Sequence, residues 1–349
     1  MNNNYPFPRV KNITVLYNEV ESLPTSDQKA ILTEEGAKDD AEKICGSLIK
    51  KGYCCDILEV TKDNFESIKD CQCDIFFNLC DGIGNIPHTE GQIPELLDKY
   101  KRKYTGSNKT AILLTTNKAK TKEIFTNSGI PTAKYVIYNS IPDHLSNFLQ
   151  YPVIAKPIAQ DCSVGLTSAS VINSDDELKV EIDTILSNYH EDALVEEYIN
   201  GREFNVTMLG NGAGLKVFPV SEIIFGDSYN DSKKPKIIDF DAKWVEDSVN
   251  YLETNGKCPA DIDEELRKTI VNLSALSFSA TGVFDYARVD IRLGKNNTPY
   301  FLEVNANPDL YPGMGAAKAA KAGGLSYEDF IEAILISAIK RYTKNTKLS

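Results

Sequence analysis

The chain of 349 residues is expected to fold as an α/β protein, because its sequence predicts both strands and helices throughout. The strands and helices are arranged differently in the first part of the chain and in the rest. In the first part, short apolar segments alternate with helical ones, which is typical of βαβ units and a parallel sheet. After about residue 107, strands follow strands with fewer helices between them, and this order favours an antiparallel, α+β arrangement. The sequence therefore predicts that residues 1–107 form a lobe of their own.

The first lobe is predicted to contain strands and helices in alternation. Runs of β-branched and apolar residues indicate strands at 12–17, 53–60 and 74–79. Apolar residues at helical spacing indicate a helix over 39–51, which Gly52 is well suited to end. A shorter helix is expected over 92–100.

The remaining residues are predicted to form a mixed region. Its expected strands are 151–157, 168–172, 193–197, 202–209, 285–293 and 299–304. Its expected helices are 118–128, 175–187, 262–280 and 327–342. Ser174 is the expected N-cap of the second of these helices, with Glu177 completing a capping box. The first four strands are expected to form one antiparallel sheet. The polar segment 225–240 is long for a connection without structure, so a functional loop is expected there.

Composition and charge argue against several classes of protein. The hydrophobic fraction of 42% and the charged fraction of 25% are those of an ordinary globular chain. A net charge of −12 opposes general nucleic-acid binding, which needs a basic surface. No apolar run reaches the ~18 residues of a membrane span, and the N-terminus lacks the apolar core of a signal peptide, so a cytoplasmic protein without a membrane partner is expected. Eight cysteines without paired CxxC units, and only three histidines, favour reduced thiols over a zinc site.

Two neighbouring strands carry the residues with the clearest chemistry. Asp290 alternates with Arg288 and Arg292 on one strand, and Glu303 alternates with Asn305 on the next. Side chains at i and i+2 share a face of a strand, so a hairpin would bring two carboxylates and an amide oxygen together. Such oxygen ligands suit Mg²⁺. The alternative is an ordinary surface hairpin, because any half-buried strand alternates charged and apolar residues.

The same hairpin resembles the signature of the ATP-grasp enzymes, with ArgValAspIle at 288–291 and PheLeuGluValAsnAla at 301–306. Other segments, in the same order along the chain, resemble the D-alanine–D-alanine ligase group of that superfamily. They are EGQIPELLDKYKRKYTGS (90–107), NKAKTKEIFTNSGIPT (117–132), YPVIAKP (151–157), SVG (163–165), VEEYINGREFNVTMLG (195–210), FPVSEI (218–223), FDAKW (240–244) and AAKAAKAGGLSYEDFI (316–331). The resemblance implies an ATP-grasp fold of three lobes, residues 1–107, 108–196 and 197–349, with ATP held between two of them.

The resemblance also implies roles for individual residues. The expected ligands of two Mg²⁺ ions, which Mn²⁺ could replace, are Asp290, Glu303 and Asn305. The expected ATP-binding residues are Lys118 and Lys156 at the phosphates, Glu196, Glu197, Tyr198 and Ile199 at the adenine, and Glu203 at the ribose. The expected catalytic residues are Arg288, Lys243 and Ser163, with Arg288 stabilising a developing oxyanion. The implied reaction joins a small-molecule carboxylate to an amine, such as an amino acid or peptide, through an acyl phosphate. Enzymes of this group are usually homodimers.

The substrate-recognition positions depart from that group. Cys80-Asp81-Gly82 stands at the family's His-Gly, Cys162 at the first serine of its flap, and Trp244 at its loop tyrosine. The segment from Asp309 to Gly315 also differs, and Glu19 or Glu21 has no certain counterpart. A thiol is a weak donor and an indole accepts no hydrogen bond, so the expected substrates are not D-alanine plus D-alanine. The alternatives are a true D-alanine–D-alanine ligase, a phosphotransferase on the same fold, and a non-catalytic ATP-binding regulatory module.

Overall fold

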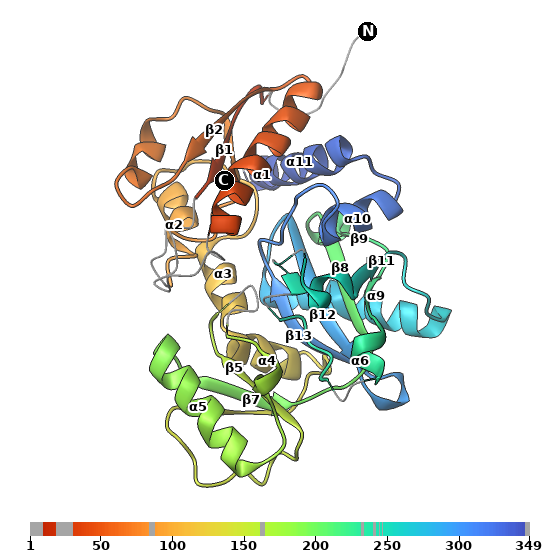
Figure 1. Ribbon diagram of the computed structural model, residues 1–349. Helices are drawn as coiled ribbons and strands as arrows, with labels where there is room; N and C mark the ends of the chain where they lie inside the picture. Colours follow the sequence, from red (N-terminus) through yellow and green to blue (C-terminus); the bar gives the residue numbers. More distant parts are fainter. Residues whose placement is uncertain are drawn as a thin grey trace.

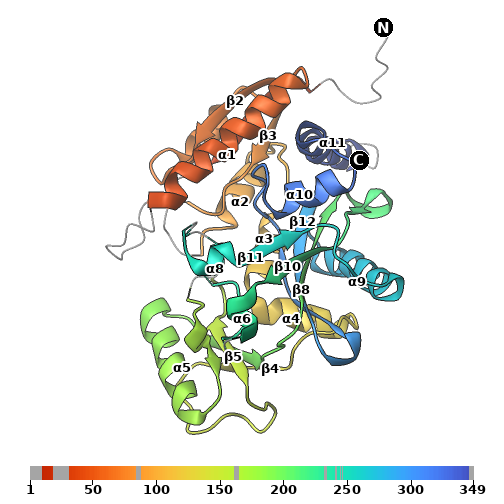
Figure 2. The same cartoon turned by 45° about the vertical axis from the view of Figure 1, so that its right-hand side comes forward.

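Three β-sheets, one in each successive part of the chain, organise the computed structural model (Figure 1). The structure describes residues 10–18, 31–83, 88–160, 165–231, 234–239, 242–243, 245 and 247–345. Helices cover the sheets, and the last helix of the chain returns to the first sheet (Figure 2). Within these ranges, no helix combines the length and apolarity needed to cross a membrane.

The first sheet is parallel, as the sequence predicts. Its strands are β1 (Asn12–Tyr17), β2 (Cys54–Glu59) and β3 (Ile75–Asn78), in the order β2-β1-β3. Helix α1 (Ile31–Lys50) begins earlier than predicted and packs between this sheet and α11 (Tyr327–Asn345). The shared core of α1, the sheet and α11 joins the first lobe to the end of the chain.

The second sheet is antiparallel and carries one helix on its buried face. Its strands are β4 (Tyr135–Tyr138), β5 (Val153–Pro157), β6 (Val171–Ile172) and β7 (Ala193–Glu197), in the order β4-β7-β5-β6. Helix α5 (Asp175–Tyr189) packs its apolar side against β5 and β7. The Ser174 side chain caps α5 by accepting from the Glu177 N–H, as predicted. The Glu177 carboxylate, however, accepts from the Asn173 N–H at 2.6 Å, one residue before the position that a capping box requires.

The third sheet is the largest and contains a strand that the sequence interpretation places wrongly. Its strands are β8 (Glu203–Leu209), β9 (Lys216–Val217), β10 (Ser221–Phe225), β11 (Thr254–Lys257), β12 (Tyr286–Leu293) and β13 (Pro299–Asn305). Their order is β11-β10-β8-β12-β13, with β9 beside β8. The prediction that β8 joins the second sheet is wrong, because β8 pairs with β10 and β12. Its apolar side chains share a core with those of β12 and of the helix α9 (Glu264–Thr281).

Helices cover the apolar face of the third sheet. Helices α3 (Lys109–Thr116), α4 (Lys118–Asn127) and α9 contribute the covering side chains. Further α-helices in the described part of the chain are α2 (Gln92–Lys99), α6 (Asp227–Asp231), α8 (Val249–Leu252) and α10 (Gly315–Ala322). Helix α6 lies inside the predicted loop 225–240, so that segment is only partly irregular.

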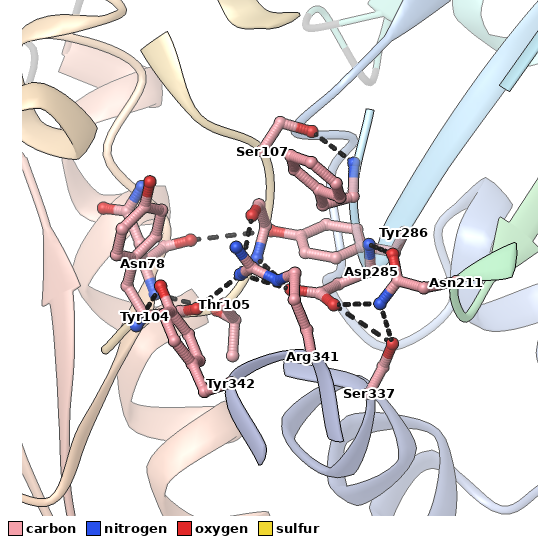
Figure 3. Close-up of polar contacts among 12 residues, drawn as sticks. Asn78, Tyr104, Thr105, Ser107, Asn211, Asp285, Tyr286, Ser337, Arg341 and Tyr342 are labelled. Atoms are coloured by element: carbon pink, nitrogen blue, oxygen red, sulfur yellow. Dashed lines mark hydrogen bonds and ion pairs between the residues drawn. The ribbon is translucent and has the colours of Figure 1, made fainter. Parts of the chain in front are cut away.

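A buried carboxylate connects the first lobe, β12 and α11 (Figure 3). The Asp285 side chain is fully buried and lies 2.8 Å from the Arg341 guanidinium. It also accepts from the Gly106 N–H at 3.0 Å, the Asn211 side chain at 2.7 Å and the Ser337 hydroxyl at 3.1 Å. Four donors from distant segments therefore fix the start of β12 relative to the first lobe.

Candidate active site

The hairpin of β12 and β13 places the predicted metal ligands side by side. The strands pair antiparallel, with Arg288 opposite Asn305 and Asp290 opposite Glu303. A β-bulge follows Asp290, so the register shifts beyond this point. The four side chains therefore lie on one face of the hairpin, as predicted.

The donor set on this hairpin suits a hard cation. Carboxylates directly opposite each other on paired strands repel unless a cation compensates them, and Asp290 faces Glu303 in this way. Arg288 supplies part of that compensation, because its Nε and Nη2 each donate to Asp290 at 2.8 Å. Across the described ranges, no group of three or more His, Cys, Asp or Glu is arranged to hold a metal. Two carboxylates and the Asn305 amide would therefore need phosphate or water oxygens to complete an octahedral Mg²⁺ site.

The positive charges of side chains from four separate segments act on Glu303. Burial raises the pKa of this carboxyl, but the nearby charges of Lys118, Lys156, Lys243 and Arg288 outweigh burial and hold its pKa below the usual value. These residues come from α4, β5, the segment 242–243 and β12. The Lys118 ammonium donates to the Gln160 carbonyl. The four positive charges thus favour the ionised form of Glu303.

Glu196 is held between two lysines, one of which the sequence interpretation missed. Its carboxylate lies 2.6 Å from the Lys156 Nζ and 2.5 Å from the Lys122 Nζ. Burial alone would raise the pKa of Glu196, yet the two ammonium groups lower it to about 2. Lys122 is fully buried, and burial lowers its own pKa. Helical spacing could have found it, because Lys122 follows Lys118 by one turn while Lys120 is exposed.

The other three residues expected at the adenine have different neighbours in the structure. Glu197 points to the opposite face of β7 from Glu196, as strand alternation requires, and lies 3.8 Å from the Lys134 Nζ. The Tyr198 hydroxyl donates to the Lys236 carbonyl at 3.2 Å. Ile199 is half-buried in the turn between β7 and β8. The structure therefore groups Tyr198 with the 234–239 segment and Glu196 with the lysines.

Glu203, the expected ribose ligand, is paired with an arginine from β12. Arg292 Nη2 lies 2.6 Å from the Glu203 carboxylate, and both side chains are buried. Burial raises the pKa of Glu203, while Arg292 opposes that increase. Arg292 also donates to the carbonyls of Gly201 and Lys236. Arg292 thus links the turn before β8 with the segment 234–239.

Acidic side chains gather beside Arg288, on the side of the first lobe. Burial, followed by the charges of Asp309, Asp39 and Asp81, raises the pKa of Asp40 on α1 to about 7. Burial also raises the pKa of Asp309, against the charges of Arg288 and Lys243. The sequence interpretation recognised Asp81 and Asp309 only as departures from a family pattern. Their proximity to α1 depends on contacts between the ends of the chain and has no local sequence signal.

Several residues singled out from the sequence lie outside the described part of the chain. They are Ser163, expected to be catalytic, together with Cys162, Trp244, Glu19 and Glu21. Of the predicted catalytic residues, Arg288 and Lys243 are described, and both act on the pKa of Glu303.

Comparisons with known proteins relate this chain to one family. A family model described as "D-ala D-ala ligase C-terminus" matches residues 124–336. An uncharacterized protein of Sinorhizobium fredii is 34% identical over 270 residues, covering 77% of this chain and 76% of that protein. D-alanine–D-alanine ligases of Cupriavidus taiwanensis and Bordetella pertussis are 27% and 29% identical, each over 71% of this chain and over 72% and 74% of their own lengths. The crystal structure of a D-alanine–D-alanine ligase from Bacillus anthracis complexed with ATP has a TM-score of 0.75 at 19% identity, covering 96% of this chain and 99% of that one, and shows the shared fold.

Proposed function

Since this chain belongs to the D-alanine–D-alanine ligase family of ATP-grasp ligases, which form C–N bonds, we propose that it joins a small carboxylate to an amine at the expense of ATP and Mg²⁺. The observation that carries this proposal is the β12–β13 hairpin, which places Asp290 opposite Glu303 and Arg288 opposite Asn305. The positive charges of Lys118, Lys156 and Lys243 also act on Glu303. One cation compensates the single negative charge of a carboxylate, so the remaining positive charges are available to another anion. A polyphosphate bound beside Glu303 would use them, because ionised donors bind phosphate oxygens strongly.

The proposed reaction has two steps. An oxygen of the substrate carboxylate attacks the γ-phosphorus of ATP, the bond from that phosphorus to the β–γ bridging oxygen breaks, and ADP leaves. The amine nitrogen then attacks the carbonyl carbon of the acyl phosphate, the bond from that carbon to the phosphate oxygen breaks, and phosphate leaves. The amine proton passes to solvent. No covalent bond to the protein is needed at either step.

The residues of the hairpin have distinct proposed tasks. Asp290, Glu303 and Asn305 would hold Mg²⁺, which when bound neutralises charge on the transferring phosphoryl group. Arg288 keeps N–H groups beyond the two that bond Asp290, since a guanidinium has five donors. These donors support its proposed task of stabilising negative charge on the carbonyl oxygen when the amine attacks.

The ATP-binding side chains are proposed to work in two groups. Lys118 and Lys156 would contact phosphates as point charges. Tyr198 and Glu203 would contact the base and the ribose. The Lys236 carbonyl accepts from both Tyr198 and Arg292, and Arg292 is paired with Glu203. This shared contact supports the proposal that the segment 234–239 lies beside the nucleotide, because the same side chains would hold both.

We propose further that the substrates are not two molecules of D-alanine. The support is chemical: Asp81 and Asp309 occupy positions where the resembling enzymes carry other residues, and burial raises the pKa of Asp309. A site that lacks the partners of a substrate's polar groups discriminates strongly against that substrate. The family relatives named as D-alanine–D-alanine ligases are therefore a guide to the chemistry only.

The proposal is tested by incubating the protein with ATP, Mg²⁺ and pools of amino acids, peptides and small acids. Phosphate release and product mass are measured together. Release that needs both a carboxylate and an amine, with a product lighter by one water than their sum, is the expected result. D-alanyl-D-alanine formed from D-alanine alone would establish the ordinary ligase instead. ATP binding without turnover on any pool would contradict catalysis. The variant Lys156→Met should abolish release, and the exposed Lys120→Met serves as its matched control.

A further inference from the structure

Asn307 lies two residues beyond the predicted metal ligand Asn305 and is bonded to it. The Asn307 N–H donates to the Asn305 Oδ1 at 2.9 Å. A side-chain amide can present either its oxygen or its nitrogen to a neighbour, and a backbone donor at this distance favours the oxygen. One lone pair of the Asn305 oxygen is used in this bond, and the other is left for a cation. The orientation of the Asn305 amide therefore depends on where residue 307 is held.

The side chain of Asn307 is held by three hydrogen bonds. Its Oδ1 accepts from the Tyr286 hydroxyl at 2.6 Å, and its Nδ2 donates to the Asp81 carboxylate at 2.6 Å and to the Leu79 carbonyl at 3.3 Å. Tyr286 is fully buried at the start of β12, where its hydroxyl lies against Asn78 (Figure 3). Rotation of the Asn307 side chain would break all three bonds, so residue 307 has one preferred position.

The amide is the group that this position requires. It must donate to a carboxylate and accept from a phenol, and an uncharged amide does both. An aspartate of the same shape would bring a second negative charge against Asp81. Leu79 and Asp81 follow β3 in the first lobe, while Tyr286 and Asn305 belong to the hairpin of the third sheet. Asn307 thus joins two parts of the fold at the end of the predicted metal site.

We propose that Asn307 is a positioning residue for Asn305, which it orients for the metal only while its side chain is bonded to Asp81 and Tyr286. This inference rests on the proposed function, because it assumes that Asn305 is a metal ligand. Residues that orient metal ligands typically change metal affinity by 10- to 100-fold when they are mutated. The same size of effect is expected here, without any loss of the ligands themselves.

The experiment measures binding of Mn²⁺ by electron paramagnetic resonance in the presence of a non-hydrolysable ATP analogue. Asn307→Asp keeps the shape and removes the donor to Asp81, and Tyr286→Phe removes one hydroxyl with little change in packing. Both variants should bind Mn²⁺ about 10- to 100-fold more weakly than the wild type. Analogue binding measured without metal should change by less than about 2-fold. Asn64→Ala is the matched control, since that side chain bonds Glu59 and Thr61 within the first lobe.

The outcomes separate this inference from the proposed function. If the wild type binds Mn²⁺ with the analogue, and Asn307→Asp and Tyr286→Phe bind it as tightly as Asn64→Ala does, the role of Asn307 is refuted and the metal site stands. If the wild type shows no Mn²⁺ binding at all with the analogue, the metal assignment fails and this inference fails with it. If Asn307→Asp does not fold, the Tyr286→Phe result decides, because that variant loses a single hydroxyl.

Discussion

Glu196 and Lys122 form an ion pair of 2.5 Å between side chains that are 3% and 0% exposed. Removing one partner of such a buried pair leaves the other charge without compensation, which typically lowers the free energy of unfolding by ~3–5 kcal/mol. Lys122→Met should therefore lower the free energy of unfolding by about that amount, although Lys156 still pairs with Glu196. Urea unfolding followed by circular dichroism measures the change.

The control for this prediction lies two residues away on the same helix, on its exposed side. Lys120 is exposed on α4, and surface substitutions usually change stability by less than ~0.5 kcal/mol. Lys120→Met should leave the unfolding midpoint nearly unchanged. Equal midpoints for the two variants would show that the pair with Glu196 contributes nothing to stability.

Glu303 offers a test of the proposed metal site through turnover. Glu303→Gln keeps the size of the side chain and removes one negative charge opposite Asp290. Charge stabilisation by a bound metal is worth several kcal/mol in the transition state, so turnover should fall by about 100-fold or more. Steady-state kinetics at several Mg²⁺ concentrations measure this. Unchanged turnover would show that Glu303 is no ligand.

Arg292 is expected to matter for nucleotide affinity rather than for chemistry. It pairs with Glu203 at 2.6 Å and donates to the Lys236 carbonyl. Hydrogen bonds to charged groups contribute ~1.5–3 kcal/mol each, so Arg292→Met should weaken ATP binding by about 10- to 100-fold. Calorimetric titration with a non-hydrolysable analogue measures the affinity. Arg202→Met is the matched control, because Arg202 forms a similar pair with Glu222 but is more exposed. Comparable losses of nucleotide affinity in both variants would argue against a specific role for Arg292.

The sequence predicts well those features that depend on spacing within one segment. Arg288, Asp290, Glu303 and Asn305 follow a two-residue repeat, and the paired strands bring these side chains together as predicted. The parallel first sheet likewise follows from alternating strands and helices. The sheet to which β8 belongs was predicted wrongly, because an amphipathic strand does not specify its partner.

Contacts between distant segments could not be predicted in this way. Arg292 meets Glu203, and Asn307 meets Asp81, although the latter two are 226 residues apart in sequence. Each of these residues looks like an ordinary polar residue in its own segment. The first pairing depends on which strand lies beside β8 in the third sheet, where Arg292 is directly opposite Glu203. The second depends on how the first lobe packs against the rest of the chain through the core that it shares with α11.

Asp40 should make stability depend on pH between about 4 and 7. Burial and the neighbouring carboxylates raise its pKa from 3.8 to about 7 in the folded protein. The folded state thus holds this proton more tightly than the unfolded state, so the stabilising contribution is complete below about pH 4 and is lost as the pH rises through 7. Asp40→Asn should therefore be more stable than the wild type at pH 8, by up to ~4 kcal/mol, with a smaller difference at pH 5. Thermal unfolding at a series of pH values tests this, with a Glu42→Gln variant at an exposed position of the same helix as control. A stability difference between Asp40→Asn and the wild type that does not grow with pH would contradict the raised pKa of Asp40.

Asp285 is expected to stabilise the contact between the first lobe, β12 and α11 that Figure 3 shows. It is fully buried and pairs with Arg341 at 2.8 Å while accepting from the Gly106 N–H and the Asn211 side chain. Asp285→Asn would leave the largely buried Arg341 guanidinium without its counter-charge, and should cost ~3–5 kcal/mol. The exposed pair of Arg267 and Glu264 supplies the control, since Glu264→Gln should cost less than ~1 kcal/mol. Denaturant unfolding measures both. Because Asp285 joins the first lobe to β12, its loss should also increase amide hydrogen exchange in β3 and β12 together, whereas an increase confined to α11 would mean that the carboxylate anchors the helix alone.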